Sequence, residues 1–571
     1  MDKIENTLSE KLHSLKSFWI FLLFAIFLLP DLYFTFAIDF ITFAHRFFAL
    51  LISVGFFSAI LFIFRNKLKI VTWIVFACSL VLGSFSLGML IFYKARLNVN
   101  AYAAVVNTNA EELKEFIDGY VLPLIISWLA LVFIFILISK FIPRKLEEKF
   151  AWKMLLAGVL LFIISGLYFT RYEKFGYHAY VREIINKECY PLYCYNAVSS
   201  YKGEAKNLAK NRKIASQFSF HAVNMDADSA KKIIVLVIGE SCRKQNWSAY
   251  GYQRETTPLL NKRKSIVFFD DAITSHNSTL KSLAIMLTPV GAANYEDHSK
   301  SRSILHLFKE AGYKTYWISN QKDDAYRLRI HMEDADSISC TTGFKSITES
   351  YDEVLIPQFK NIISQNQNLF IVVHLNGNHL KYEDRYPPAF DIFGKDNMDK
   401  LNKEGYYNVR SKQKVTDYFD NSMLYQDFIL DSLISMIETG NKTSCLFYAS
   451  DHGEDLFDDC RNLTGHGGTF SEASFRIPFF VYVDSTFQKN YSGKYSALLK
   501  NKNKKIIAGE DIFYTLSDLA NINFPGRQVT KSISSVDFTE QEKRMILLPD
   551  NKIAAFEDQL IKEKELVEKC R

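Results

Sequence analysis

The sequence lacks several features that would assign it to a simple class. Its eight cysteines include no Cys-x-x-Cys pair, which makes a cysteine-based metal site a weak interpretation. It contains no internal repeat and no low-complexity segment, so a repeat architecture is not expected. The net charge is only +6 over 571 residues and is spread along the chain, so the composition gives no case for nucleic-acid binding.

Long apolar runs are present, and they are confined to the first 170 residues. Five stretches have roughly 20 apolar residues each, which is enough to cross a bilayer. They cover residues 17–38, 46–64, 70–93, 121–142 and 152–170. The first begins near Phe18 and has no small-residue cleavage site, so we expect it to remain as an anchor. An all-α transmembrane domain of five helices is therefore predicted over residues 1–170.

The basic residues of the short loops predict how these helices are oriented. Lysine and arginine are concentrated in the N-terminal tail, the 65–69 turn and the 140–153 loop, which share one side in a five-span arrangement. The 94–120 segment on the other side is less basic and carries four acidic residues between positions 111 and 118. Because basic loops stay in the cytoplasm, the N-terminus is predicted to be cytoplasmic and the chain after residue 171 to lie outside the membrane.

Residues 171–230 are predicted to connect the membrane domain to a second domain. The segment is basic, aromatic and helical in pattern, which favours an amphipathic helix on the bilayer surface; a plain solvated linker is the alternative. An oxidising compartment would permit disulfides, most readily between Cys189 and Cys194, although spacing alone does not fix the pairing.

From residue 231 onwards, short apolar strands alternate with helical stretches. The expected strands cover residues 233–238, 314–318, 369–374, 445–449 and 478–483, and the clearest helices cover residues 280–287, 301–311 and 419–438. This alternation predicts an α/β domain over residues 231–571, with a mainly parallel sheet and helices on both faces.

The first of these strands ends in a group that can carry chemistry. After Gly239 the chain presents Glu240 and Ser241, at the sheet edge where α/β proteins bind ligands and metals. Glu240 is therefore a metal ligand or an acid–base group, and the alternative is an ordinary polar turn.

Further polar groups follow other predicted strands or begin a predicted helix. Ser278 and Thr279 lead into a helical run, where a helix N-terminus can hold phosphate, although an ordinary helix cap is the alternative. The remaining groups are His374 and His379 around an Asn-Gly turn, Asp451 and His452 after a strand, and His466 in a glycine-rich loop. A carboxylate beside an imidazole suits zinc or manganese.

Together these segments resemble the alkaline phosphatase/sulfatase superfamily, and within it the membrane-anchored phosphoethanolamine transferases of Gram-negative bacteria. That family modifies lipid A or the lipopolysaccharide core and includes polymyxin-resistance enzymes. The resemblance is carried by Gly-Glu-Ser-x-Arg and Tyr-Gly-Tyr-x-Arg-x-Thr-x-Pro within 239–258, by Ser278-Thr279-x-x-Ser282, and by Ser-Asp-His-Gly-Glu at 450–454. The five spans, the connector and the α/β domain also match the family's layout.

The resemblance implies a role for each matched position. It implies one zinc ion, or two, with manganese less favoured, and a first metal held by Glu240, Thr279, Asp451 and His452. Thr279 would be the nucleophile, with Ser278 the next candidate. His379 and His466 would bind substrate phosphate, act as acid or base, or hold a second metal, and Thr108 and Glu112 would face the head group of the lipid donor.

The same resemblance implies the reaction and its location. Phosphoethanolamine would pass from phosphatidylethanolamine to lipopolysaccharide or lipid A through a covalent phosphothreonine, with the catalytic domain in the periplasm and the anchor in the inner membrane. Two departures resemble the core-modifying subgroup and leave the acceptor open: Ala104 replaces an expected asparagine, and no cysteines bracket the nucleophile.

Two other functions stay open from the sequence alone. One is a phosphoglycerol transferase of the lipoteichoic-acid-synthase type, which shares the metal and threonine chemistry. The other is a non-catalytic membrane scaffold or lipid sensor on the same fold. The Tyr-Gly-Tyr motif and the His379–His466 pair favour phosphoethanolamine transfer, and the presence of every matched ligand speaks against a scaffold.

Overall fold

The structure is a computed structural model that divides into two compact units, Met1–Glu204 and Ala205–Arg571. The residues it describes are 16–37, 43–93, 96–107, 121–172, 180–226, 231–321, 326–340, 351–394, 406, 408–438 and 442–570. Each unit is described separately. The predicted domain boundaries at 170 and 230 remain predictions.

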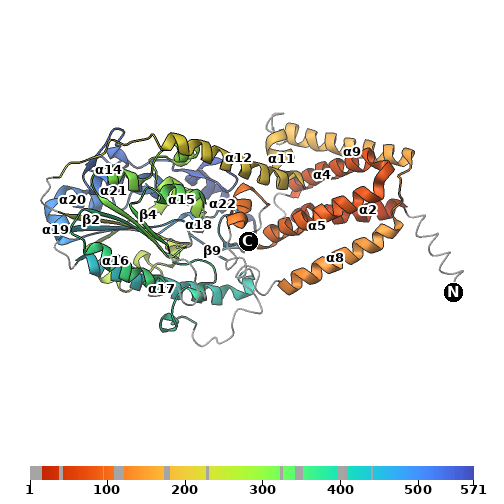
Figure 1. The fold of residues 1–571 in the computed structure, drawn as a ribbon. Coiled ribbons are helices and arrows are strands. Elements are labelled where there is room, and N and C mark those ends of the chain that lie inside the picture. The colour runs from red at the N-terminus through yellow and green to blue at the C-terminus, as the bar shows by residue number, and fades with distance from the viewer. Residues whose placement is uncertain are drawn as a thin grey trace. The chain divides into compact units, whose positions relative to one another are not determined.

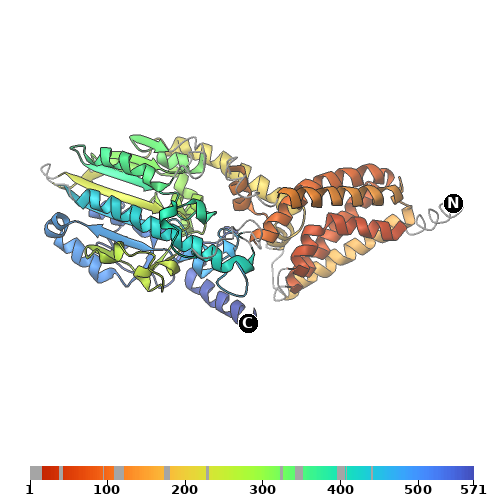
Figure 2. The same cartoon turned by 90° about the horizontal axis from the view of Figure 1, so that it is seen from below.

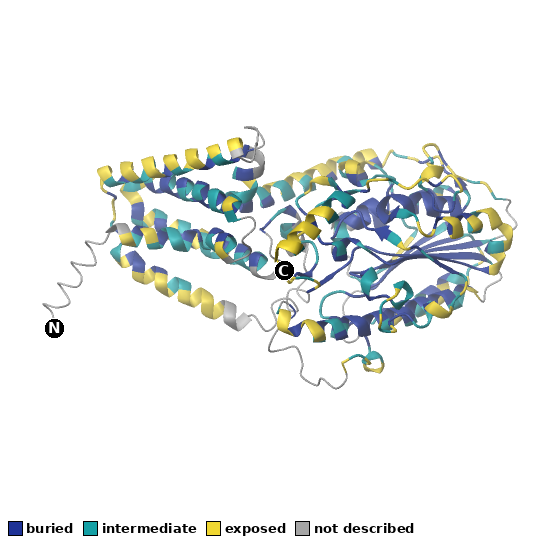
Figure 3. Cartoon of the chain, turned by 180° about the vertical axis from the view of Figure 1, so that it is seen from behind, coloured by how far each residue is buried: buried dark blue, intermediate teal, exposed yellow. Residues whose placement is uncertain are grey.

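Apolar helices make up most of the first unit (Figure 1). They are α2 (Lys16–Phe27), α3 (Leu29–Ala37), α4 (Phe43–Ile63), α5 (Leu68–Tyr93), α6 (Val99–Asn107), α8 (Val121–Phe141) and α9 (Glu148–Leu167). Many of their apolar side chains face outwards, for example Leu129 at 64% exposure and Leu156 at 63% (Figure 3). Exposed apolar surface on long helices of this kind is suited to lipid.

Among the described residues, fewer helices are of membrane length than the five spans predicted. Within the described residues, Phe43–Ile63, Arg65–Leu90 and Glu148–Arg171 are long and apolar enough to cross a membrane. The pair α2 and α3 adds a fourth span if it is counted as one, although it is bent by 76°. In α8 the apolar stretch Ile125–Phe141 is shorter than the others, so a fifth span there remains a prediction.

The bend in the first predicted span has a local cause. The break between α2 and α3 falls at Leu28, and Pro30 follows within the first turn of α3. Proline lacks a backbone N–H and clashes with a preceding helical turn, so it fits the start of a helix and not its interior. The predicted span over 17–38 is therefore bent, a feature that hydropathy does not register.

The disulfide between Cys189 and Cys194 that an oxidising compartment would permit is not formed. Both thiols are free and buried, and they face different hydrophobic clusters. Cys189 packs with Ala49 and Ile52, whereas Cys194 at the start of α12 (Leu192–Ala215) belongs to the larger cluster of α2, α4 and α5. The predicted helical character of the connector is confirmed by α12 and by the short helices Tyr180–Ile185 and Asn186–Glu188.

A seven-stranded sheet forms the centre of the second unit, in the order β3-β11-β8-β2-β7-β5-β6. Its strands are β2 (Lys232–Gly239), β3 (Ile266–Phe268), β5 (Lys314–Ser319), β6 (Ser337–Cys340), β7 (Leu369–His374), β8 (Thr443–Ser450) and β11 (Phe479–Val483). Within this sheet, β11 alone runs opposite in direction to the other strands. The mainly parallel sheet is confirmed, and the five predicted strands end within two residues of their observed ends.

Helices cover both faces of this sheet because its central strand is apolar on both sides (Figures 1 and 2). Ile234, Leu236 and Ile238 of β2 belong to a core with α13 (Thr279–Met286), α14 (Ile304–Glu310) and α21 (Ala508–Leu519). The alternate residues Ile233 and Val235 belong to a second core with α16 (Leu355–Ile363) and α17 (Lys412–Glu438). A continuous apolar strand of this kind is typical of a parallel sheet buried on both faces.

Smaller elements complete the unit. The remaining helices are α15 (Tyr326–Met332), α18 (Glu472–Phe475), α19 (Ser485–Asn490), α20 (Ser492–Asn501) and α22 (Phe556–Cys570). Two-stranded sheets are formed by β1 (Val223–Asn224) with β13 (Ile522–Asn523), β4 (Asp271–Ile273) with β12 (Lys505–Ile507), β9 (Asp455–Leu456) with β10 (Thr464–Gly465), and β14 (Met545–Leu547) with β15 (Ile553–Ala555). The β9–β10 hairpin matters most here, because it follows Asp451 and His452 and precedes His466.

Candidate functional site

The carboxyl ends of β2 and β8 bring the predicted metal ligands together. The two strands pair in parallel, with Gly239 opposite Ser450, so Glu240 and Asp451 leave the sheet side by side. His452 follows on the same turn. This is the edge at which open α/β sheets bind ligands.

Glu240, Asp451 and His452 form a compact buried trio. His452 Nε2 lies 3.5 Å from Glu240 Oε1 and 3.3 Å from Asp451 Oδ2. One ligand atom from each residue lies within 4.8 Å of the other two. None of the three side chains is more than 1% exposed. Two carboxylates and one imidazole at this separation match the donor set of a catalytic zinc site.

The polar contacts of the trio also fit a cation. Asp451 Oδ1 accepts hydrogen bonds from the backbone N–H groups of Ser241 (3.0 Å) and His452 (2.7 Å), but its buried Oδ2 has no hydrogen-bond partner. Burial raises the pKa of Asp451, and the adjacent Glu240 charge raises it further. A divalent cation would neutralise both carboxylates and supply the missing partner of Oδ2.

The imidazole of His452 is also oriented to bind a cation. Its Nδ1 lies 2.9 Å from the carbonyl oxygen of Gly453, to which it donates as Nδ1–H, so the lone pair of Nε2 faces Glu240 and Asp451. Metal-binding histidines are commonly oriented by such a bond to the second ring nitrogen. Gly453 is required here, because a Cβ at this position would lie 2.1 Å from the carbonyl oxygen of Ala473.

Backbone strain at Ser241 contributes to the site. Ser241 has a φ of +56°, a left-handed conformation that is uncommon for serine. This turn allows its N–H to reach Asp451 Oδ1 while its hydroxyl donates to Glu240 Oε1 at 2.9 Å. Ser241 therefore orients two carboxylates, as expected for a neighbour of the metal ligands and not for a nucleophile.

Of the two predicted hydroxyls, Thr279 is the one that faces the trio. Thr279 Oγ1 lies 3.3 Å from Glu240 Oε2 and 3.2 Å from His452 Nε2. Thr279 is the first residue of α13 and is half-buried. The Ser278 hydroxyl turns to His276 Nδ1 at 2.9 Å. The geometry therefore favours Thr279 over Ser278 as the nucleophile.

A second group of ionisable residues lies next to the first. The ring centroids of His452 and His466 are 3.9 Å apart, and His466 Nδ1 lies 2.7 Å from Glu454 Oε2. The other Glu454 oxygen accepts from the Tyr382 hydroxyl at 2.8 Å. Burial opposes a charge on His466, but the Glu454 carboxylate outweighs this effect and raises the pKa of His466. His466 is thus suited to be a protonated acid, or, with His452 and Glu454, a further metal ligand.

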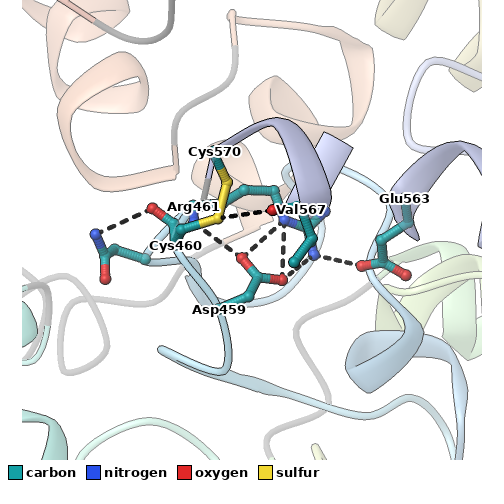
Figure 4. The surroundings of a disulfide bond; sticks show 7 residues. Asp459, Cys460, Arg461, Glu563, Val567 and Cys570 are labelled. Atoms are coloured by element: carbon teal, nitrogen blue, oxygen red, sulfur yellow. Dashed lines mark hydrogen bonds and ion pairs between the residues drawn. A yellow bond between two sulfur atoms is a disulfide. The ribbon is translucent and has the colours of Figure 1, made fainter. Parts of the chain in front are cut away.

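The His466 hairpin is tied to the C-terminal helix α22 by a disulfide between Cys460 and Cys570 (Figure 4). Beside it, the Arg461 guanidinium pairs with Asp459 at 2.6 Å and also with Glu563 of α22. The residues between β9 and β10 are therefore anchored by one covalent and one ionic contact. No cysteine spacing in the sequence indicated this pair, which is separated by 110 positions.

The structure says less about the other predicted residues, His379, Thr108 and Glu112. His379 is half-buried on the loop after β7, and its charge contributes to the environment of Glu240. Burial disfavours ionised Glu240, but His452, His379 and His466 together lower its pKa to about 2. Thr108 and Glu112 lie outside the described residues, so their placement toward a lipid donor remains a prediction.

The sequence prediction missed three residues of the site. Glu454 was part of the quoted Ser-Asp-His-Gly-Glu motif but had no role, and Tyr382 had no signal of its own. Gln321 donates to Glu240 Oε2 at 3.0 Å from the carboxyl end of β5. The rule that parallel strands end at a common ligand-binding edge would have drawn attention to Gln321, two residues past the end of the run 314–319.

Comparisons with known proteins agree with this fold. The family model described as "Sulfatase" matches residues 232–522, just over half of the chain. The curated protein "Phosphoethanolamine transferase EptC" of Escherichia coli is 25% identical over 503 residues, which cover 84% of this chain and 85% of that protein.

Two solved structures are similar. The C-terminal periplasmic domain of EptC from Escherichia coli, crystallised in complex with zinc, shows 27% identity and a TM-score of 0.52 over 59% of this chain and 95% of that chain. The integral membrane phosphoethanolamine transferase EptA from Neisseria meningitidis has a TM-score of 0.69 at 20% identity, over 89% of this chain and 98% of that chain, which shows the shared fold. The chain belongs to the sulfatase family, within its group of membrane-anchored phosphoethanolamine transferases.

Proposed function

We propose that this protein transfers phosphoethanolamine from phosphatidylethanolamine to lipopolysaccharide, at its core or at lipid A, through a covalent intermediate on Thr279. The observation that carries the proposal is the position of the Thr279 hydroxyl, 3.2 Å from His452 Nε2 and 3.3 Å from Glu240 Oε2. A hydroxyl at the start of a helix and beside a metal-type donor set is placed to act as a nucleophile on phosphorus.

Zinc is the cofactor that the donor set suits best. Glu240, Asp451 and His452 would hold it, with the Thr279 oxygen completing the coordination. When bound, zinc would supply the positive charge that lowers the pKa of a neighbouring hydroxyl. Ser241 and Gly453 keep the carboxylates and the imidazole in place through the contacts described above.

In the first half-reaction, Thr279 attacks the phosphorus of the donor lipid. The hydroxyl proton passes to solvent, an Oγ1–P bond forms, and the bond from phosphorus to the diacylglycerol oxygen breaks. Protonated His466 gives its proton to that leaving oxygen, so diacylglycerol departs as a neutral alcohol. Glu454 keeps His466 protonated until then, because its carboxylate raises the pKa of the imidazole.

In the second half-reaction, the acceptor replaces Thr279. Neutral His466 takes the proton of an acceptor hydroxyl, whose oxygen attacks the phosphorus. The Oγ1–P bond breaks, and Thr279 Oγ1 takes back a proton from solvent. When the acceptor is a phosphate instead, its oxygen is already ionised and needs no base. His379 lies close enough to influence Glu240 and is suited to hold the phosphate oxygens.

A membrane anchor is consistent with this reaction. Donor and acceptor are both lipids, and the first unit contains several membrane-length apolar helices. We propose that the N-terminus is cytoplasmic and that the catalytic unit lies in the periplasm of a bacterium with an inner membrane. Tethering the enzyme to the bilayer confines its search for both substrates to the membrane surface.

The test is a transfer assay with the full-length protein in detergent, zinc, phosphatidylethanolamine and purified lipopolysaccharide. Mass spectrometry of separated lipid A and core fractions is expected to show added phosphoethanolamine in one fraction, and none with Thr279→Ala. If phosphatidylglycerol is the only productive donor and phosphoglycerol is the added group, the proposed donor is wrong and the protein is a phosphoglycerol transferase.

A further inference from the structure

The side-chain amide of Gln321 contacts Glu240 as a hydrogen-bond donor. Its Nε2 lies 3.0 Å from Glu240 Oε2 and 2.9 Å from the carbonyl oxygen of Leu375. Both partners are acceptors, so the amide nitrogen must be the atom that faces them and both of its hydrogens are used. Gln321 thus links the carboxylate that follows β2 to the backbone that follows β7.

Glu240 has a defined partner on each oxygen as a result. The Ser241 hydroxyl donates to Oε1 at 2.9 Å, and Gln321 donates to Oε2. Ser241 is next to Glu240 in the chain, whereas Gln321 comes from a different strand. Among the described side chains outside the 239–241 turn, only Gln321, Thr279 and His452 form a hydrogen bond or ion pair with this carboxylate.

The backbone of Gln321 is itself held in place. Its N–H donates to Ser319 Oγ at 3.0 Å. The neighbouring residue Asn320 donates to Asp352 Oδ1 at 2.8 Å, and the two oxygens of Asp352 accept the N–H groups of Asn376 and Gly377. The carboxyl end of β5 is therefore fixed to the loop that carries His379, which gives Gln321 a rigid base.

We infer that Gln321 is a positioning residue for the metal centre, which sets zinc affinity by holding the carboxylate of Glu240 in its ligating orientation. This inference rests on the metal centre of the proposed function. A ligating carboxylate that is held before the metal arrives loses less rotational freedom on binding. Hydrogen-bond partners of metal ligands typically change metal affinity by 10- to 100-fold when they are removed.

Gln365, between α16 and β7, offers a matched control. Gln365 is also a half-buried glutamine with a hydrogen-bonded amide, and it accepts from the Tyr316 hydroxyl of β5 at 2.7 Å. It contacts neither Glu240 nor the loop after β7 in any contact that the structure gives. Gln365→Met therefore removes an amide that contacts β5 without touching the proposed centre.

The experiment measures zinc binding to the full-length protein in detergent, stripped of metal and titrated against a chromophoric chelator. Gln321→Met, which keeps the side-chain length but not the amide, is expected to raise the zinc dissociation constant about 10- to 100-fold. Gln321→Asn, whose amide is one methylene too short to reach both acceptors, is expected to do the same. Gln365→Met is expected to match the unsubstituted protein.

Activity supplies the second readout. Gln321→Met is expected to lose transfer at limiting zinc and to regain near-normal kcat at saturating zinc, which a damaged fold would not allow. Zinc affinity equal to that of the unsubstituted protein in both Gln321 variants overturns the inference and leaves the proposed function standing. Absence of zinc binding in the unsubstituted protein overturns the proposed metal centre, and the inference with it.

Discussion

The metal trio and the His466 hairpin are built in different ways. Glu240, Asp451 and His452 come from the ends of two adjacent parallel strands, and their positions follow from the register of the sheet. His466 reaches the same place at the end of a two-stranded hairpin that is tied to the C-terminal helix by a disulfide. The trio therefore depends on the central core, whereas His466 depends on contacts far away in the sequence.

This difference separates two chemical tasks. A metal centre needs ligands that do not move, and strand ends in a buried sheet provide them. An acid that serves first the leaving group and then the acceptor must face the opening through which both lipids arrive. His466 is more exposed than the trio, at 27% against no more than 1%. Substitutions in the two regions are therefore expected to change catalysis and the free energy of unfolding to different extents.

The largest effect is expected from Thr279→Ala, which removes the attacking oxygen. Turnover should fall by at least about a thousandfold, while the free energy of unfolding stays close to that of the unsubstituted protein. Ser278→Ala is the matched control, because it removes a neighbouring hydroxyl that faces His276. Full activity in Thr279→Ala together with loss in Ser278→Ala would move the nucleophile to Ser278.

Asp451→Asn is expected to break the metal centre while keeping the turn. The asparagine carbonyl can still accept from Ser241 and His452, but an NH₂ group replaces the unpartnered Oδ2 and cannot bind a cation. Zinc measured by elemental analysis after dialysis should fall to a small fraction, and activity with it. Retention of stoichiometric zinc by this variant would show that Asp451 is not a ligand.

Glu454→Gln is expected to act through His466 and to show in the pH profile. The Glu454 charge raises the pKa of His466, so its removal lowers that pKa. His466 must be protonated to release diacylglycerol, and the loss of activity on the alkaline side should therefore begin at a lower pH. Above that point, diacylglycerol release should be slower by up to about a hundredfold.

The pH profile of that variant is best measured as the single-turnover release of diacylglycerol. Glu438→Gln is a suitable control, since Glu438 pairs with Arg263 at 2.9 Å and does not contact His466 in any contact that the structure gives. An alkaline limb that stays in place in Glu454→Gln would mean that His466 is not the acid. Under that outcome His466 is better considered as a ligand of a second metal.

The smallest effect on chemistry is expected from the paired change Cys460→Ser and Cys570→Ser. Loss of the disulfide should lower the free energy of unfolding by about 2–4 kcal/mol, measured by denaturant titration. Zinc affinity should not change, because the trio belongs to the sheet. Transfer should fall modestly, through His466 alone. Cys340→Ser, which removes a thiol outside any disulfide, controls for the substitution itself.

A fall in zinc affinity in that double variant would contradict the separation of the two regions. It would mean that the hairpin supports the metal centre as well as His466. An unchanged free energy of unfolding would instead show that the ionic contact between Arg461 and Glu563 is enough to hold α22.

The structure brings the three predicted ligands together, as their positions directly after strands led us to expect, and their role as metal ligands stays a prediction. An apolar strand that ends in a carboxylate places that carboxylate at a sheet edge. The parallel pairing of β2 with β8 then places Glu240 beside Asp451. The helix start at Thr279 was likewise recognisable from local signals. The assignment of Glu240, Asp451 and His452 as ligands, and of Thr279 as the nucleophile, also needed the resemblance to the phosphoethanolamine transferases. Strand ends and a helix start alone left a polar turn and a helix cap as alternatives.

Other features could not be predicted because they depend on distant contacts. The bond from Gln321 to Glu240 joins residues 81 positions apart, and the disulfide joins residues 110 positions apart. The bend at Pro30 was missed because a hydropathy window averages over it, and the expected Cys189–Cys194 bridge failed because the two thiols face different clusters. Apart from the bend, which has a local cause, tertiary packing decided the outcome in each case.

The most direct test of a covalent Thr279 intermediate is the mass of the peptide that contains it. Full-length protein is incubated with zinc and phosphatidylethanolamine without an acceptor, quenched in acid, digested and analysed by tandem mass spectrometry. We predict one added phosphoethanolamine on Thr279, released again when lipopolysaccharide is supplied before the quench. An unmodified Thr279 in protein that has already released diacylglycerol, or an adduct on another residue, would contradict the mechanism.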